Sequence, residues 1–330
     1  MVMDAPSNLG EILVKSDDDL VLECGCAPAD RSFEEYVRKG VIVLDKPPGP
    51  SSHQVSAWLR DVVGVSKAGH SGTLDPKVTG LLPVFLESAT RLVGSLLSSG
   101  KEYVGVMRLH ADIPTERVEA VFSELTGSIY QKPPLKSAVK RSLRIRKVYA
   151  FQLLEREGRD VLFRVSCEAG TYVRKLLHDA GLLLGCGAHM QELRRTRVGC
   201  FTEDDAFILQ DVKDASILNA EAGGEERLRA IIRPMEAAVA HMKKIWLKGS
   251  AVSAVSHGAK LMAPGVARLH ASIKTGDPVA LMTSKGEVVA LAEALIPAED
   301  ILKLSKGVVA KQSRVIMDPD TYPRVWGPNK

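Results

Sequence analysis

The sequence predicts an α+β protein with a mixed, largely antiparallel sheet, flanking helices and a small C-terminal β-barrel. The chain has 330 residues, which is long for a single hydrophobic core. Strand and helix patterns interleave, yet several neighbouring strands are spaced as hairpins rather than as parallel units. From His241 onward, short strands, one small helix and the tight turn TSKGE are typical of a small barrel.

These patterns divide the chain into four segments. We expect an N-terminal extension over residues 1–38, which is polar and in places acidic, and a large domain over 39–240. The barrel is expected over 241–320, followed by a tail over 321–330.

The large domain is predicted to open with a strand, a Pro/Gly turn and a helix, from the segment GVIVLDKPPGPSSHQVSAWLRDVVG. Either Ser51 or Ser52 is a suitable N-cap. Apolar residues then recur at helical spacing, at Val55, Trp58, Leu59 and Val62.

Further along, the pattern predicts a helix near 87–98 and a strand pair around 101–110. A helix capped by Thr115 is expected next, and a strand, turn and helix over 160–187. Residues 219–241 read as a helix with a Gly-Gly break.

Composition excludes several classes of protein. Hydrophobic content of 45% and charged content of 25% are globular values, and the net charge of +4 permits a nucleic-acid partner without requiring one. Five scattered cysteines form neither a disulfide framework nor a paired zinc motif. No signal peptide and no apolar run of membrane-spanning length is present, so we expect a soluble, intracellular protein.

Familiar catalytic motifs are missing or incomplete. GSLLSSGKE has the wrong spacing for a phosphate loop, and GCGAHM follows a predicted helix and lacks the last glycine of a dinucleotide fingerprint. The sequence has no HExxH and no GxSxG, which gives no support to a metal hydrolase or a serine hydrolase.

Two basic groups are candidates for an RNA-binding track. One carries no acidic residue among Lys132, Lys136, Lys140, Arg141, Arg144, Arg146 and Lys147, and the other comprises Arg194, Arg195 and Arg197. A solvated surface is the alternative interpretation of such runs. Two runs without balancing acids favour phosphate contacts, for which Arg is well suited.

The segment AGHSGTLDPKVTG, residues 68–80, places one carboxylate, Asp75, in a polar loop between two apolar segments. Turn chemistry explains its glycines and Pro76. A polar loop held by core-forming segments is also a common place for function. Asp75 is therefore either a turn residue or a reactive one.

A series of motifs resolves this choice. GHSGTLDPKVTGLLPVFLESATRLV, preceded by VLDKPPGPSSHQV and followed by GKEYVGVMRLH, GTYVRKL and HMQELRRTRVG, resembles the TruB-type pseudouridine synthases. The resemblance runs from about Gly40 to DPDTYPRVW and is to the archaeal and eukaryotic dyskerin branch, the catalytic subunit of H/ACA guide-RNA particles. It implies a pseudouridine-synthase sheet followed by a PUA domain.

The resemblance assigns roles to six residues. Asp75 would be the catalytic aspartate, acting at the ribose–base junction either as a nucleophile or as a base. Arg174 would keep it ionised and oriented in a pocket that excludes water. Tyr103 would stack on the extruded base and serve in the later proton removal. The residues expected to bind the flipped uridine are His70, Tyr172 and Leu193.

The resemblance also implies the partners. A guide RNA would select the target, rRNA with tRNA as a further candidate, because no gripping insertion separates LKSAVKR from SLRIRKVY. Three protein partners are implied, a small zinc-binding-type protein, a small β-barrel protein and a kink-turn-binding protein of ribosomal type. No cofactor, metal or membrane is implied, and the location would be cytoplasmic in an archaeon and nucleolar in a eukaryote. The rival hypotheses are a stand-alone tRNA enzyme and a non-catalytic RNA-binding scaffold.

Overall fold

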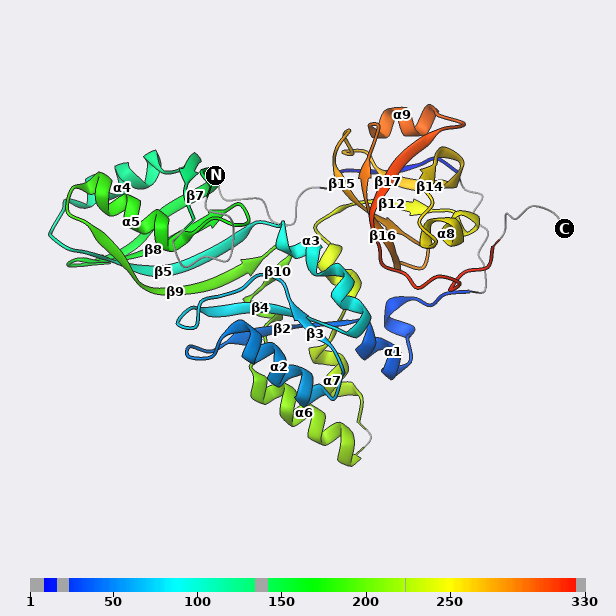
Figure 1. Ribbon diagram of the computed structural model, residues 1–330, viewed down its shortest axis with the longest axis horizontal. Helices are drawn as coiled ribbons and strands as arrows, with labels where there is room; N and C mark the ends of the chain where they lie inside the picture. The colour runs from blue at the N-terminus through cyan, green and yellow to red at the C-terminus, as the bar shows by residue number, and fades with distance from the viewer. Residues whose placement is uncertain (1–8, 17–23, 134–141, 223, 325–330) are drawn as a thin grey trace. The chain divides into compact units, whose positions relative to one another are not determined.

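A computed structural model of the chain describes residues 9–16, 24–133, 142–222 and 224–324. The described residues form two compact units (Figure 1). The first unit takes its residues from 42–84 and 93–224. The second takes its residues from 9–16, 24–41, 85–92 and 225–324.

The first unit is built on a sheet with the strand order β2-β4-β9-β5-β8-β7-β6, in which β3 also pairs with β4 and β10 with β9. Its strands are β2 (Gly40–Lys46), β3 (Ala68–His70), β4 (Thr79–Leu86), β5 (Lys101–Leu109), β6 (Gly127–Gln131), β7 (Arg144–Glu157), β8 (Asp160–Cys167), β9 (Ala188–Val198) and β10 (Phe201–Thr202). β4 and β9 are parallel, whereas β9, β5, β8, β7 and β6 pair antiparallel in that order. The predicted mixed, largely antiparallel sheet is confirmed.

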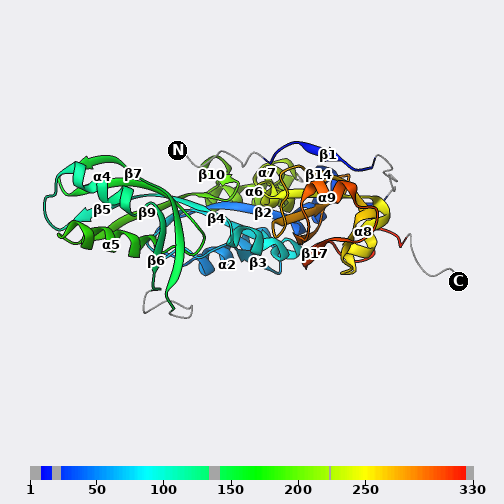
Figure 2. The same cartoon turned by 90° about the horizontal axis from the view of Figure 1, so that it is seen from above.

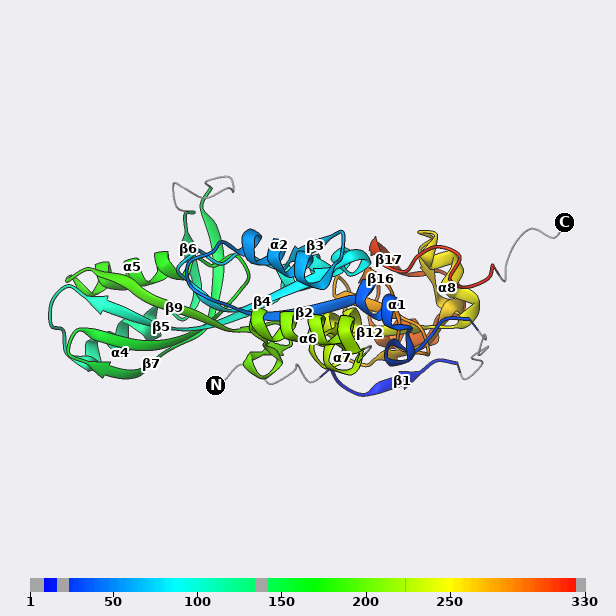
Figure 3. The same ribbon diagram turned by 90° about the horizontal axis from the view of Figure 1, so that it is seen from below.

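Helices cover this sheet in two groups. They are α2 (Ser52–Val63), α3 (Val93–Leu97), α4 (Thr115–Glu124), α5 (Val173–Leu184) and α6 (Leu209–Ala222). α4 and α5 pack together on β7 and β9, and their apolar faces share one core with β5 and β8. α2 and α6 lie side by side near β2 (Figure 3), joined by a bond from Ser216 Oγ to the Val62 carbonyl at 2.8 Å.

Local sequence signals explain the start of α2. Ser51 is its N-cap and forms a capping box with Gln54. Ser52 lies in the first turn instead and binds the loop before β4. The predicted apolar stripe is only partly buried, since Trp58 is exposed.

Two local predictions are wrong. The segment predicted as a strand pair forms one long strand, β5 (Lys101–Leu109), because β8 and β9, both distant in sequence, pair with its two edges. Thr115 does not cap α4, whose N-cap is Pro114. The Thr115 hydroxyl accepts a hydrogen bond from Arg156 instead.

The second unit is a sheet with the order β1-β14-β12-β15-β16-β17-β13 around one apolar core. Its strands are β1 (Ile12–Val14), β12 (Lys243–Leu247), β13 (Leu261–Met262), β14 (Val266–His270), β15 (Pro278–Met282), β16 (Val288–Ala294) and β17 (Val308–Val315), and its helices are α1 (Phe33–Arg38), α7 (Glu226–Ile231), α8 (Gly249–Ser256) and α9 (Ala298–Lys303). The predicted β-rich C-terminal unit and its TSKGE turn are confirmed, because Thr283 and Glu287 close the hairpin between β15 and β16.

Segments far apart in sequence complete this second unit. β1 adds an antiparallel strand to β14 (Figure 2), and Arg31 donates two hydrogen bonds to Glu236. β11 (Arg233–Pro234) pairs with Gly40 and Val41. The predicted helix over 219–241 is shorter than expected, since α6 and α7 are followed by β11 and a 3-10 turn over Met235–Val239.

No helix among the described residues is long and apolar enough to cross a bilayer. The five cysteines are free thiols, as the spacing of the cysteines predicts.

The parallel pairing of β4 with β9 brings two backbones into close contact at Gly80 and Arg195. Gly80 has φ of +95°, a conformation that an L side chain rarely adopts. A Cβ added there would also lie 2.2 Å from the Arg195 carbonyl oxygen. Only glycine therefore fits at the junction between the two strands.

We predict that Gly80→Ala destabilises the first unit by more than about 3 kcal/mol, since backbone overlap adds to the strain of positive φ. The matched control is Gly64→Ala, which has φ of +73° but no atom within 4 Å of the added Cβ. It should cost about 1–2 kcal/mol. Hydrogen exchange of β4 and β9 amides measures both. Equal losses in the two variants would contradict the steric argument.

Candidate active site

Asp75 lies in the loop that joins β3 to β4, and the local sequence holds this loop in place. The Val78 amide donates to the Asp75 carbonyl at 2.9 Å, which closes a turn around Pro76. On the preceding side, Ser52 Oγ accepts from the Leu74 amide at 2.8 Å and donates to its carbonyl at 3.1 Å. The Asp75 side chain projects from a loop tied down on both sides.

Lys46, at the end of β2, is the second support of this loop. Its side chain is buried, with a relative exposure of 0%. The ammonium donates to the carbonyls of Pro47, Pro76 and Val78 at 2.9, 3.0 and 2.9 Å. Burial lowers the pKa of Lys46, and the negative charge of Asp75 opposes that shift.

Arg174 reaches Asp75 from the first turn of α5. The two side chains form an ion pair between Nη2 and Oδ2, and they are 59% and 54% exposed. Buried Gln131 positions the start of α5, since its amide group donates to the Tyr172 carbonyl at 3.2 Å and accepts from the Tyr172 amide at 3.0 Å. The predicted pair is brought together, but the expected exclusion of water is absent in the free chain.

Tyr103 and Leu193 lie on the neighbouring strands β5 and β9. Tyr103 is partly buried, and burial raises the pKa of its hydroxyl. Leu193 is only 8% exposed and packs in the core, where Gly105 across the strand pair leaves room for it. Tyr172 is half-buried directly before α5.

His70 ends β3, next to the Asp75 loop. Its ring centroid is 4.7 Å from that of His53. Its Nε2 atom is buried and has no hydrogen-bond partner among the described residues. Burial lowers the pKa of His70, and the charges of His53 and Arg195 lower it further. The lack of a partner for Nε2 and the lowered pKa both favour a neutral imidazole ring.

The predicted RNA-binding residues differ in their surroundings. Arg195 is 1% exposed, so its prediction as a phosphate contact is wrong. Arg194 is bound to Asp45 and Glu203, which together raise its pKa. Lys136, Lys140 and Arg141 lie outside the described residues.

Three further members of the basic group lie on β7. Arg144 is half-buried, Lys147 is exposed and Arg146 pairs with Glu168 at 3.8 Å. β6 and the start of β7 project from the first unit as a two-stranded ribbon (Figure 3). Arg144, Arg146 and Lys147 stay candidates for contact with RNA.

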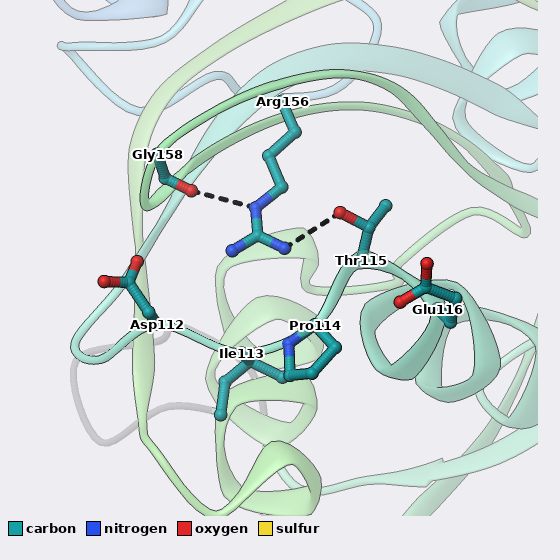
Figure 4. Close-up of a pocket in the computed structure, with 7 residues that line it drawn as sticks. All are labelled: Asp112, Ile113, Pro114, Thr115, Glu116, Arg156 and Gly158. Atoms are coloured by element: carbon teal, nitrogen blue, oxygen red, sulfur yellow. Dashed lines mark hydrogen bonds between the residues drawn. The ribbon is translucent and has the colours of Figure 1, made fainter.

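A separate pocket of about 620 Å3 lies between the β5–α4 connection and the β7–β8 turn (Figure 4). Arg156 points into it and donates to the Gly158 carbonyl at 2.8 Å and to Thr115 Oγ1 at 3.0 Å. Asp112 and Glu116 flank the guanidinium. None of the predicted site residues lines this pocket. The two hydrogen bonds of Arg156 join the β7–β8 turn to the start of α4. The described residues also contain no cluster of three or more His, Cys, Asp or Glu side chains that could hold a metal ion.

Family models cover nearly the whole chain. The TruB family pseudouridylate synthase N-terminal domain matches residues 60–173, and the tRNA pseudouridylate synthase B C-terminal domain matches 174–240. A PUA domain matches 243–316 and a DKCLD domain matches 6–56. The chain belongs to the TruB family of pseudouridine synthases. The DKCLD domain and the solved structures below place it in the dyskerin branch of that family.

Curated TruB relatives and solved structures match along their full length. The probable tRNA pseudouridine synthase B of Archaeoglobus fulgidus is 54% identical over 318 residues, 96% of this chain and 98% of the relative. The corresponding protein of Methanopyrus kandleri is 51% identical over 96% of this chain and 94% of its own. These are enzymes of RNA pseudouridylation, and this chain is an RNA pseudouridine synthase.

Two solved structures share the fold. A chain in a crystal structure of a Cbf5-Nop10-Gar1 complex has a TM-score of 0.92 and 51% identity, covering 97% of this chain and 98% of that chain. A chain in a structure of an H/ACA RNP bound to a substrate RNA containing 2'-deoxyuridine has a TM-score of 0.89 and 50% identity, covering 96% and 97%.

The sequence motifs identify Asp75 and Arg174 but miss the residues that hold them. In the sequence, Lys46 and Gln131 look like parts of a strand end and a basic segment, although both are buried and bind the backbone of the site. A single polar residue at the end of an apolar strand is the signal that could have found Lys46.

We predict that Lys46→Met lowers the free energy of unfolding by about 3 kcal/mol or more, because it leaves three carbonyls near the loop without their donor. The matched control is Lys175→Met, which breaks a surface pair with Asp179 and should cost less than about 1 kcal/mol. Urea unfolding followed by circular dichroism measures both. A Lys46 variant as stable as the control would show that the ammonium does not hold the loop.

Proposed function

We propose that this chain is the catalytic subunit of an H/ACA guide-RNA particle and converts selected uridines of rRNA to pseudouridine with Asp75 as the catalytic group. The ion pair between Asp75 and Arg174 is the observation that carries the catalytic part of this proposal. The full-length similarity to the two H/ACA structures supports the guide.

The reaction breaks the bond between ribose C1′ and N1 of the base and joins C1′ to C5. The hydrogen on C5 leaves and N1 gains one, so the product is an isomer of uridine. An ionised carboxylate at the ribose–base junction serves such a reaction, either as a nucleophile or as a base. Arg174 pairs with Asp75 and fixes the direction of its carboxylate. RNA bound over this exposed pair would exclude water and strengthen the attraction.

The other site residues fit the handling of an extruded base. Tyr103 and Tyr172 offer ring faces for stacking, and Leu193 provides an apolar wall. His70, at the end of β3, is placed to assist extrusion or to support the Asp75 loop. Burial raises the pKa of the Tyr103 hydroxyl above its usual value, so its use in proton removal requires a group that favours ionisation.

The hypothesis of a guide RNA is favoured because little of the chain is available to read the base sequence of the target. Residues 132–143 connect β6 to β7, and the projecting ribbon carries Arg144 and Lys147, whose contacts with phosphate would be independent of sequence. Selection would then come from pairing with a guide, and the PUA domain would hold the guide. The expected partners are a small zinc-binding-type protein, a small β-barrel protein and a kink-turn-binding protein. The presence of Nop10 and Gar1 in the similar complex supports small protein partners of this kind.

A stand-alone action on tRNA is the second candidate, because the curated relatives are named as probable tRNA pseudouridine synthases. The archaeal sources of those relatives favour a cytoplasmic location.

We predict that Asp75→Asn lowers the single-turnover rate of pseudouridine formation at least about 10,000-fold, because shape is kept while the charge is lost. RNA affinity should change less than about 3-fold, since it depends on phosphate contacts. Asp179→Asn, on the surface of α5, is the control and should keep the wild-type rate. An Asp75 variant that retained a few per cent of the wild-type rate would remove Asp75 from the chemistry.

We predict that an unstructured target oligonucleotide is modified only with a matching guide and assembled partners at near-physiological salt. A mismatched guide and the oligonucleotide alone should give no product, since the protein's own contacts cannot select one uridine. A tRNA stem-loop is offered in parallel, because its fold alone can present a uridine. Efficient modification of the lone oligonucleotide would replace the guide hypothesis with the stand-alone one.

A further inference from the structure

Arg195 is the largest side chain in the fully buried interior of the first unit, and it lies beside the Asp75 loop. Its Nε donates to the Leu81 carbonyl at 2.8 Å and its Nη2 donates to the Gly72 carbonyl at 3.1 Å. Gly72 follows β3 and Leu81 lies in β4. One guanidinium therefore joins the two sides of the hairpin that carries Asp75.

Tyr103 lies beside the same guanidinium. The two residues are opposite each other in the antiparallel pairing of β5 with β9, which places their side chains on the same face of the sheet. Arg195 forms no ion pair with a carboxylate among the residues that the structure describes, so its charge is directed at carbonyl oxygens and at this hydroxyl. Burying a cation that has only neutral acceptors costs free energy. This cost suggests that Arg195 has a role beyond stabilising the fold.

We propose that Arg195 is a positioning residue of the active site, whose guanidinium fixes the Tyr103 hydroxyl relative to the hairpin that presents Asp75. This proposal rests on the site proposed above, in which Tyr103 meets the extruded base. It assigns Arg195 a part in the reaction that differs from the phosphate contact predicted from the basic run.

Electrostatics adds a second consequence. Burial raises the pKa of the Tyr103 hydroxyl, and the positive charge of Arg195 opposes that shift. The nearby charge of Asp75 raises the Tyr103 pKa further. Arg195 is thus the group that favours ionisation of this hydroxyl, which any use of Tyr103 as a proton acceptor would need.

The test compares Arg195→Gln with Arg108→Gln in the full-length chain. Arg108 lies near the other end of β5 and pairs with Asp160 in a half-exposed contact, so its variant removes the same charge from the same sheet. Each protein is prepared with 3-fluorotyrosine, and the pH titration of Tyr103 is followed by 19F NMR with Tyr103→Phe as the assignment. Single-turnover rate and RNA affinity are measured on the same preparations.

We expect the Tyr103 pKa to rise by at least about 1 in Arg195→Gln and to stay unchanged in Arg108→Gln. The single-turnover rate of Arg195→Gln should fall at least about 100-fold while RNA affinity changes less than about 3-fold. An unchanged Tyr103 titration would overturn the proposal, because a merely structural role does not require this contact. So would a rate equal to that of Arg108→Gln.

Should Arg195→Gln fail to fold, Tyr103→Phe tests the same contact from the other side without opening a large cavity. Loss of the hydroxyl should shift the side-chain 15N resonances of Arg195, and unshifted resonances would overturn the proposal. A wild-type chain inactive on every RNA would contradict the proposed function instead. The pH titration of Tyr103 reports on the interaction between Arg195 and Tyr103 whether or not the wild-type chain is active on RNA.

Discussion

The presentation of Asp75 depends on two buried cations that donate to backbone carbonyls. Lys46 binds the carbonyls of Pro76 and Val78, and Arg195 binds those of Gly72 and Leu81. Because carbonyl oxygens are neutral acceptors, these bonds fix the loop without cancelling either positive charge. The same groups that shape the turn therefore leave positive charge close to the Asp75 loop.

The ion pair of Asp75 with Arg174 adds little to the stability of the free chain, since both side chains are more than half exposed. Its strength depends on what covers it. In water the two charges are screened, whereas a nucleotide laid over them would lower the local dielectric constant and raise the attraction several-fold. The chain thus keeps the Asp75 carboxylate accessible while RNA is absent. In the proposed reaction, the substrate itself would complete the environment that the chemistry needs.

Sequence motifs are sufficient for the class of fold, for the pairing of Asp75 with Arg174, and for an N-cap of α2 at Ser51 or Ser52, of which the structure has Ser51. They fail where distant segments decide the outcome. The pattern of β5 suggests two strands because its pairing partners, β8 and β9, lie far along the chain. Arg195 resembles a surface partner of Arg194 in the sequence, although adjacent residues of a strand point to opposite faces. Leu193 lies two residues before Arg195, on the same face of β9, and it packs in the core, so Arg195 faces the interior as well.

Because side chains alternate between the two faces of a strand, fewer of the predicted basic residues are available to bind RNA. Arg194 is occupied by Asp45 and Glu203, Arg146 by Glu168, and Arg195 by the interior. Among the described residues, the basic groups therefore offer fewer unengaged charges than their composition suggests. The salt-dependent attraction of RNA weakens as the number of cations facing phosphate falls. In the proposed particle, a guide held by the PUA domain would add affinity without placing any sequence-reading residue beside Asp75.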